Sequence, residues 1–191
     1  MGIKERIMNF VKINGITHQV GGDKVVVKEN KVFIDDKEIT RITEKHVTIE
    51  WVGEPPTNIT LNRGDLKCGD VKGDIYAEGN IECGNVGGYA DAGGNVTCKD
   101  VGDKVEAGGN IICGNVGGSA QTEEGNIQAG NVQEWADAGG DINCGNVGDY
   151  VDSGGNVKCG DVGGYVEAED GNVVCKAVSG DINAETVKVE R

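Results

Sequence analysis

Apolar residues recur along most of this chain in short groups, with one polar residue between neighbouring apolar ones. From residue 64 onward, the pattern Ile-x-Cys is followed by a single Val and then by Ala-x-Ala, as in Ile81, Cys83, Val86, Ala90 and Ala92. An alternation of apolar and polar positions is typical of β-strands with one buried face. The pattern therefore predicts very short strands and no helices.

The whole pattern repeats with a period of fifteen, which is the step from Cys68 to Cys83 and from Cys83 to Cys98. Cysteine is its clearest marker and stands at positions 68, 83, 98, 113, 144, 159 and 175, with Ala129 in the place of one missing member. Two longer steps place one-residue insertions near Glu123-Glu124 and Glu169-Asp170. Strands in register at a fixed period indicate a single-stranded parallel β-solenoid, in which each coil buries its apolar side against its neighbours.

Glycine supplies 33 of the 191 residues, and each coil opens on a Gly followed by Asn or Asp. These residue types tolerate left-handed backbone angles, so they predict sharp corners between the strands. Stacked Asn side chains are also expected to hydrogen-bond from one coil to the next. Aromatic residues make up only 4% of the chain. The composition predicts an all-β fold with a thin core of Ala, Val and Cys.

Residues 1–63 lack the repeat and are predicted to form a small β-rich cap on a solenoid of eight coils over residues 64–191. Within the cap, residues 23–39 have the pattern of a hairpin and residues 46–52 that of a further strand. The alternation that starts at Ile59 already fits the beginning of the stack. Eight coils are expected to rise roughly 38 Å at the ordinary strand spacing.

Charge divides the chain at the same place. Residues 1–63 hold 10 basic and 9 acidic side chains, whereas residues 64–191 hold 8 and 23, which together give the net charge of −14. So acidic a surface repels nucleic acid and anionic lipid, whose phosphates require Lys or Arg. Neither is expected as a direct partner. The lack of an apolar secretory segment and the odd number of cysteines, seven, favour a cytoplasmic location.

The cysteine column has no recognisable metal or catalytic pattern. Zinc sites usually take ligands in closely spaced pairs, but the chain contains no Cys-x-x-Cys and no His after His46. The thiols are therefore interpreted as small apolar filler of the core, in keeping with the replacement by Ala129. No nucleophile–base arrangement or phosphate-binding loop is evident either. The sequence predicts that the protein is not an enzyme and holds no metal or cofactor.

Equivalent positions of successive coils form columns along the predicted solenoid. One outward-facing column has a composition that folding alone does not require. It flanks the Ala-x-Ala strands, and its predicted binding residues are Tyr89, Trp135, Asp137, Tyr150, Asp152, Tyr165 and Glu167. Exposed aromatic residues beside charged ones are typical anchors of protein interfaces. The alternative interpretation is that the stacked rings only stabilise the ladder, while the acids keep this face soluble.

These observations favour a non-enzymatic structural or interaction protein. The first hypothesis is a rigid acidic rod that forms homo-oligomers, through its last rung at Val187-x-Val189 or through the aromatic column, or that displays a face to another protein. The alternative is an acidic module that imitates DNA and thereby inhibits a DNA-binding protein. A third hypothesis is carbohydrate binding by the stacked aromatic residues.

The phrase GNVxCGNVGG, which stands at 79–88 as GNIECGNVGG with Ile81 in place of the first Val, resembles Gly-rich repeat proteins of bacteria and their phages. The architecture also resembles the bactofilins, polymer-forming bacterial β-helix proteins with more aliphatic repeats, which implies end-to-end assembly. The pentads GNIEC (79–83) and GNVGG (84–88) resemble those of pentapeptide-repeat proteins. The third pentad, YADAG (89–93), departs from that pattern because its central residue is Asp91, which disfavours a four-sided coil.

Overall fold

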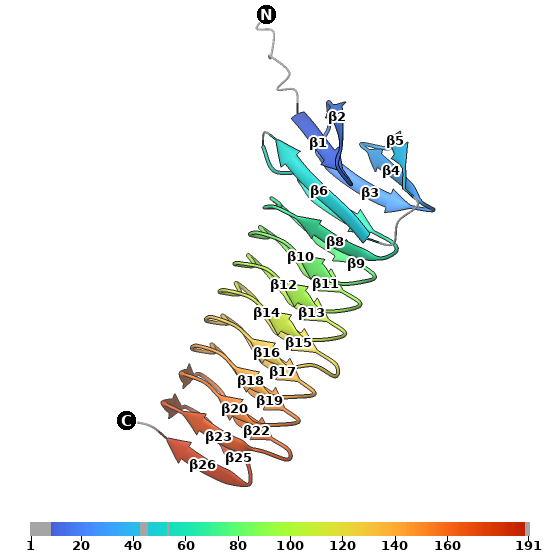
Figure 1. Ribbon diagram of the computed structural model, residues 1–191. Coiled ribbons are helices and arrows are strands. Elements are labelled where there is room, and N and C mark those ends of the chain that lie inside the picture. Colours follow the sequence, from blue (N-terminus) through green and yellow to red (C-terminus); the bar gives the residue numbers. More distant parts are fainter. Residues whose placement is uncertain (1–8, 43–45, 53, 190–191) are drawn as a thin grey trace, which may run out of the picture.

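The chain folds into a straight all-β rod (Figure 1). The computed structural model describes residues 9–42, 46–52 and 54–189. Equivalent strands of successive coils pair in parallel register, as where Ile81 lies between Leu66 and Val96. The predicted parallel β-solenoid is therefore confirmed.

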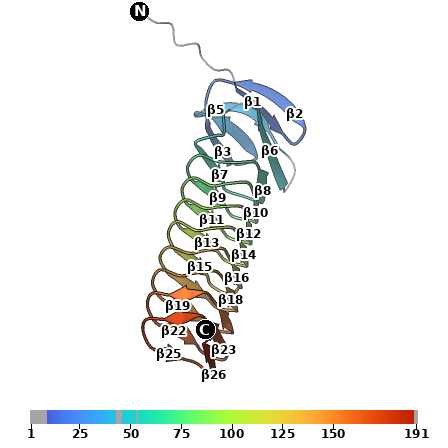
Figure 2. The same ribbon diagram turned by 90° about the vertical axis from the view of Figure 1, so that its left-hand side faces the viewer.

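Two twelve-stranded sheets run along the described part of the rod, and Figure 2 shows them on different sides of it. In spatial order, the first sheet contains β2 (Ile16–Val20), β1 (Asn9–Ile13), β6 (His46–Val52), β8 (Asp65–Cys68), β10 (Ile81–Glu82), β12 (Val96–Thr97), β14 (Ile111–Ile112), β16 (Ile127–Gln128), β18 (Ile142–Asn143), β20 (Val157–Lys158), β23 (Asn172–Cys175) and β26 (Thr186–Val189). From β6 onward all its pairs are parallel, whereas β1 pairs antiparallel with both β2 and β6.

The second sheet carries the Ala-x-Ala segments. In spatial order it contains β25 (Ile182–Asn183), β22 (Val166–Ala168), β19 (Val151–Ser153), β17 (Ala136–Ala138), β15 (Ala120–Thr122), β13 (Val105–Ala107), β11 (Ala90–Ala92), β9 (Ile75–Ala77), β7 (Asn58–Leu61), β3 (Lys24–Lys28), β4 (Lys31–Ile34) and β5 (Lys37–Arg41). Only the β3–β4 and β4–β5 pairs are antiparallel, so the remaining strands continue one regular stack.

A third side of each coil is formed by the single Val between the two sheets. These valines pair in parallel as isolated bridges from Val71 to Val162, and the side ends in the short pair β21 (Asp161–Val162) and β24 (Ala177–Val178). A coil therefore has three sides, and its apolar residues meet at the centre. In the coil that begins at Gly79, the buried residues are Ile81, Val86, Ala90 and Ala92.

The cap extends both sheets of the solenoid. The predicted hairpin at 23–39 is present as β3, β4 and β5, and the predicted strand at 46–52 is β6. The hairpin β1–β2 was not predicted, although its Asn14-Gly15 turn, with φ of 45° and 86°, is a strong local signal. Because β6 and β7 already pair in parallel with β8 and β9, the stack has one turn more than the eight predicted.

The predicted reason for the corner glycines is wrong. Among the described glycines, only Gly15 and Gly64 have a positive φ, and of these only Gly64 opens a coil, so the corners of the later coils are not left-handed. Glycine is required there because neighbouring coils approach closely. A Cβ on Gly87 would lie 1.9 Å from the carbonyl oxygen of Lys72, and a Cβ on Gly102 would lie 2.2 Å from that of Gly87.

Asparagine ladders connect the coils, as predicted. The Oδ1 atom of Asn80 accepts hydrogen bonds from both the backbone N–H (2.8 Å) and the Nδ2–H (2.9 Å) of Asn95, one coil further on. Along this column, from Asp65 to Asn172, the backbone N–H of each later member donates to the Oδ1 of the member one coil before it. The side chain therefore satisfies a corner N–H that the sheets leave without a partner.

The role of close approach can be tested with two glycines. Gly87→Ala places a methyl group against the Lys72 carbonyl, and we expect it to lower the free energy of unfolding by about 2 kcal/mol or more. Gly69→Ala is the matched control, because a Cβ at Gly69 would meet nothing within 4 Å. Its effect should stay within about 0.5 kcal/mol. Urea unfolding that gives equal losses for the two variants would contradict this account.

Candidate functional site

The predicted binding residues lie along the outer face of the second sheet. In each coil, one of them directly precedes the strand and the other is its central, outward-facing residue, as with Trp135 and Asp137 at β17. Parallel pairing places Asp137, Asp152 and Glu167 next to one another in neighbouring strands. We call this set the aromatic–acidic strip; it comprises Trp135, Tyr150, Tyr165, Asp137, Asp152 and Glu167.

The three rings of the strip are stacked nearly parallel. The ring centroids of Trp135 and Tyr150 are 5.6 Å apart with an interplanar angle of 4°, and those of Tyr150 and Tyr165 are 5.0 Å apart with an angle of 2°. The in-register backbone aligns the rings, so each inner ring face is covered by its neighbour. Tyr165 remains 42% exposed.

The acids of the strip repel one another. Partial burial and the neighbouring Asp152 carboxylate raise the pKa of Asp137, and partial burial and Glu167 raise that of Asp152. The pKa of Tyr150 is raised by burial and by the surrounding negative charges, which include Asp149. The strip is therefore a strongly negative surface in which a column of stacked rings runs beside a column of carboxylates.

Tyr89 does not belong to this cluster. It lies nearer the cap in the same column, where its hydroxyl donates a hydrogen bond to the Glu106 carboxylate. Lys104 also pairs with Glu106, and its Nζ atom lies 3.3 Å from the Oε1 of Gln121. The acid in this part of the column thus has a cationic partner within the chain.

Lys104 is a functional candidate that the sequence analysis did not single out. Its Nζ atom lies 5.4 Å from the centroid of the Trp135 ring, although the two residues are two coils apart in the column. Ser119 stands between them and is buried. Its small side chain leaves room for this cation–π contact. The sequence does contain a signal for this contact, because the small residue Ser119 stands between the large residues Lys104 and Trp135 in the same column.

All seven cysteines are free thiols; Cys159 and Cys175 are buried in the core, and the other five are partly buried at its edge. Donation of the S–H proton to a neighbouring sulfur, together with burial, raises the pKa of Cys83, Cys113, Cys159 and Cys175. The pKa of Cys98 is lowered, because Cys98 accepts hydrogen bonds from Cys113 and Cys83. Within the described residues, no group of three or more His, Cys, Asp or Glu side chains is arranged to hold a metal ion. None of the described segments is a helix able to cross a membrane.

The repulsion along the strip predicts that Asp152→Asn stabilises the rod. A carboxylate whose pKa is raised by folding disfavours the folded state above that pKa, and this penalty disappears as the pH falls through it. At pH 7 we expect Tm to rise by about 1–3 °C. Calorimetry at pH 3 should show no such gain.

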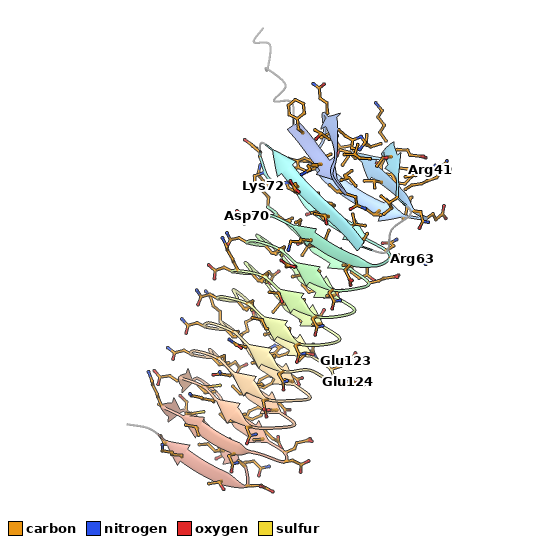
Figure 3. The ribbon with its side chains drawn as sticks, in the orientation of Figure 1. Arg41, Arg63, Asp70, Lys72, Glu123 and Glu124 are labelled. Atoms are coloured by element: carbon orange, nitrogen blue, oxygen red, sulfur yellow. The ribbon has the colours of Figure 1, made fainter. Side chains whose placement is uncertain are left out.

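The matched control for this measurement is Glu124→Gln. It removes the same charge at the first insertion, which Figure 3 shows at the side of the rod. An equal rise in Tm for both variants at pH 7 would mean that net charge, and not the contact between Asp152 and its neighbours, determines the effect.

No family model, curated protein or solved structure matches this chain.

Proposed function

We propose that this protein is a non-enzymatic structural protein, a stiff acidic rod that self-associates. The observation that carries the proposal is the exposure of apolar side chains on β26. Val187 and Val189 pair in register with Val173 and Cys175, which are buried in the core. They therefore belong to the core-facing side of their strand, yet they are 45% and 48% exposed.

An exposed apolar strand favours pairing with another chain. The outer edge of β26 has no strand paired to it among the described residues, so its backbone groups can form a further ladder. We propose that a second copy of the chain covers this face, which extends both the ladder and the thin core across the contact.

The cap presents a different surface at the opposite end of the rod. Two of its described strands are edge strands, β2 in the first sheet and β5 in the second. β5 carries the exposed side chains of Lys37, Glu38 and Arg41, and Glu38 forms ion pairs with Lys31 and Arg41. Charged edge strands discourage pairing. Because β26 alone among the described strands exposes two valines of its core-facing side, the contact is proposed to join two β26 faces about a two-fold axis, as most homodimers do.

Light scattering on the full chain tests this proposal. The wild-type chain should have the mass of a dimer. The variant Val187→Lys/Val189→Lys should have the mass of a monomer, because the contact would bury its two lysine ammonium groups against the same two groups of the other copy. The matched control Gln128→Lys/Asn143→Lys adds the same charge on the exposed outer face of the same sheet and should remain a dimer. A monomeric wild type, or a dimer of the β26 variant, would refute the proposal.

Imitation of DNA is a second candidate function, favoured by the distribution of charge. No Lys or Arg occurs between Lys104 and Lys158, while acids repeat along the rod at the coil spacing. The cytoplasmic location and the bacterial or phage origin implied by the resemblance remain predictions that suit such a partner. A DNA mimic should displace duplex DNA from a basic DNA-binding domain, and this competition should weaken with added salt.

A further inference from the structure

The ring stack of the aromatic–acidic strip has two end faces, and they differ. On one end, Lys104 lies over Trp135 at 5.4 Å, so the chain places one of its own cations on the stack. On the other end is Tyr165. Because Val166 pairs with Ile182, the residue that follows Tyr165 in the column is Asp181. Among the described residues no ring continues the stack there, and Tyr165 is 42% exposed; we call this face of its ring the open face.

The open face of Tyr165 lies in a negative environment. The charges of Asp152, Glu167 and Asp149 all act on its hydroxyl group. Glu167 itself is held in place, since its Oε1 accepts a hydrogen bond of 3.1 Å from the Nδ2 of Asn183. A flat apolar surface and a positioned carboxylate therefore lie side by side.

Arginine fits this arrangement better than any other side chain. Its guanidinium group is planar, stacks on aromatic rings and pairs with a carboxylate through parallel hydrogen bonds. Lysine provides the charge but neither the flat face nor the paired geometry. Charge attraction alone would require only the acids, whereas the aligned rings add a preference for a flat cation.

We propose that the open face of Tyr165 binds an arginine side chain from a basic segment of another protein, with the guanidinium on the ring and paired with Glu167. The bound arginine then covers the Tyr165 end of the stack, just as Lys104 covers the Trp135 end. The remaining acids of the strip attract further basic residues of the same segment. This site goes beyond the proposed self-association and does not depend on it.

Fluorescence anisotropy with two labelled twelve-residue peptides tests the proposal. One peptide alternates Arg and Gly, and the other alternates Lys and Gly, so their charge and length are equal. The wild-type protein should bind the Arg peptide about threefold to tenfold more tightly than the Lys peptide. Equal affinities for the two peptides, or no binding of the Arg peptide, would overturn the proposal.

Variants of Tyr165 separate the ring from other effects. Tyr165→Phe keeps the ring and should retain the preference for Arg, whereas Tyr165→Leu keeps the apolar bulk and should abolish the preference. Unchanged melting temperatures would show that both variants are folded. If Tyr165→Leu binds the Arg peptide as the wild type does, the ring is not the platform and the proposal fails.

Matched triple substitutions test the acids. Asp137→Asn/Asp152→Asn/Glu167→Gln should weaken binding of the Arg peptide at least about tenfold, since it removes the charges that the guanidinium groups would pair with. The control Glu124→Gln/Glu169→Gln/Asp170→Asn removes equal charge at the two insertions. Equal losses for both would mean unspecific attraction to an acidic rod and would overturn the proposal.

The same assay distinguishes this site from the proposed self-association. The variant Val187→Lys/Val189→Lys should bind the Arg peptide as the wild type does. The peptide result can therefore fail while the light-scattering result holds, and the reverse is also true.

Discussion

The spacing between neighbouring β-strands, about 4.8 Å, is the constraint on which the whole molecule depends. Every coil must come this close to the next one at its sides and at its corners. Glycine is needed where a carbonyl oxygen of the preceding coil occupies the position of a Cβ, as at Gly87. Asparagine is needed where a corner N–H has no partner in a sheet, as at Asn95. The Gly and Asn positions that recur in every repeat are therefore a consequence of this one inter-strand distance.

The same spacing creates the aromatic–acidic strip. Parallel strands in register give equivalent side chains the same direction, so one aromatic residue per coil produces stacked rings and one acid per coil produces a row of like charges. The first arrangement is favourable and the second is not, as the raised pKa of Asp137 indicates. A stack that tolerates this repulsion is suited to a cationic partner, and Lys104 already provides one within the chain.

The fold was largely predictable because a fixed period specifies which residues are neighbours. The core, the two insertions and the asparagine ladders all follow from the register of the repeat. The corner geometry was not predictable, since a glycine needed for close approach and one needed for positive φ look alike in a sequence. Tyr89 illustrates the same limit at the site. It shares a column with Trp135, but its contact with Glu106 depends on side-chain reach and separates it from the ring stack.

The two one-residue insertions have a consequence for how such a rod changes over time. Both widen a single corner, and the coils on either side keep their register, as Ile111 does with Ile127 across the first insertion. An insertion of one residue is thus accommodated at one corner, whereas gain or loss of a full repeat adds or removes a complete coil. Duplication of a short stretch of gene would lengthen the rod by one step, without redesigning its core or disturbing the surfaces already present on it.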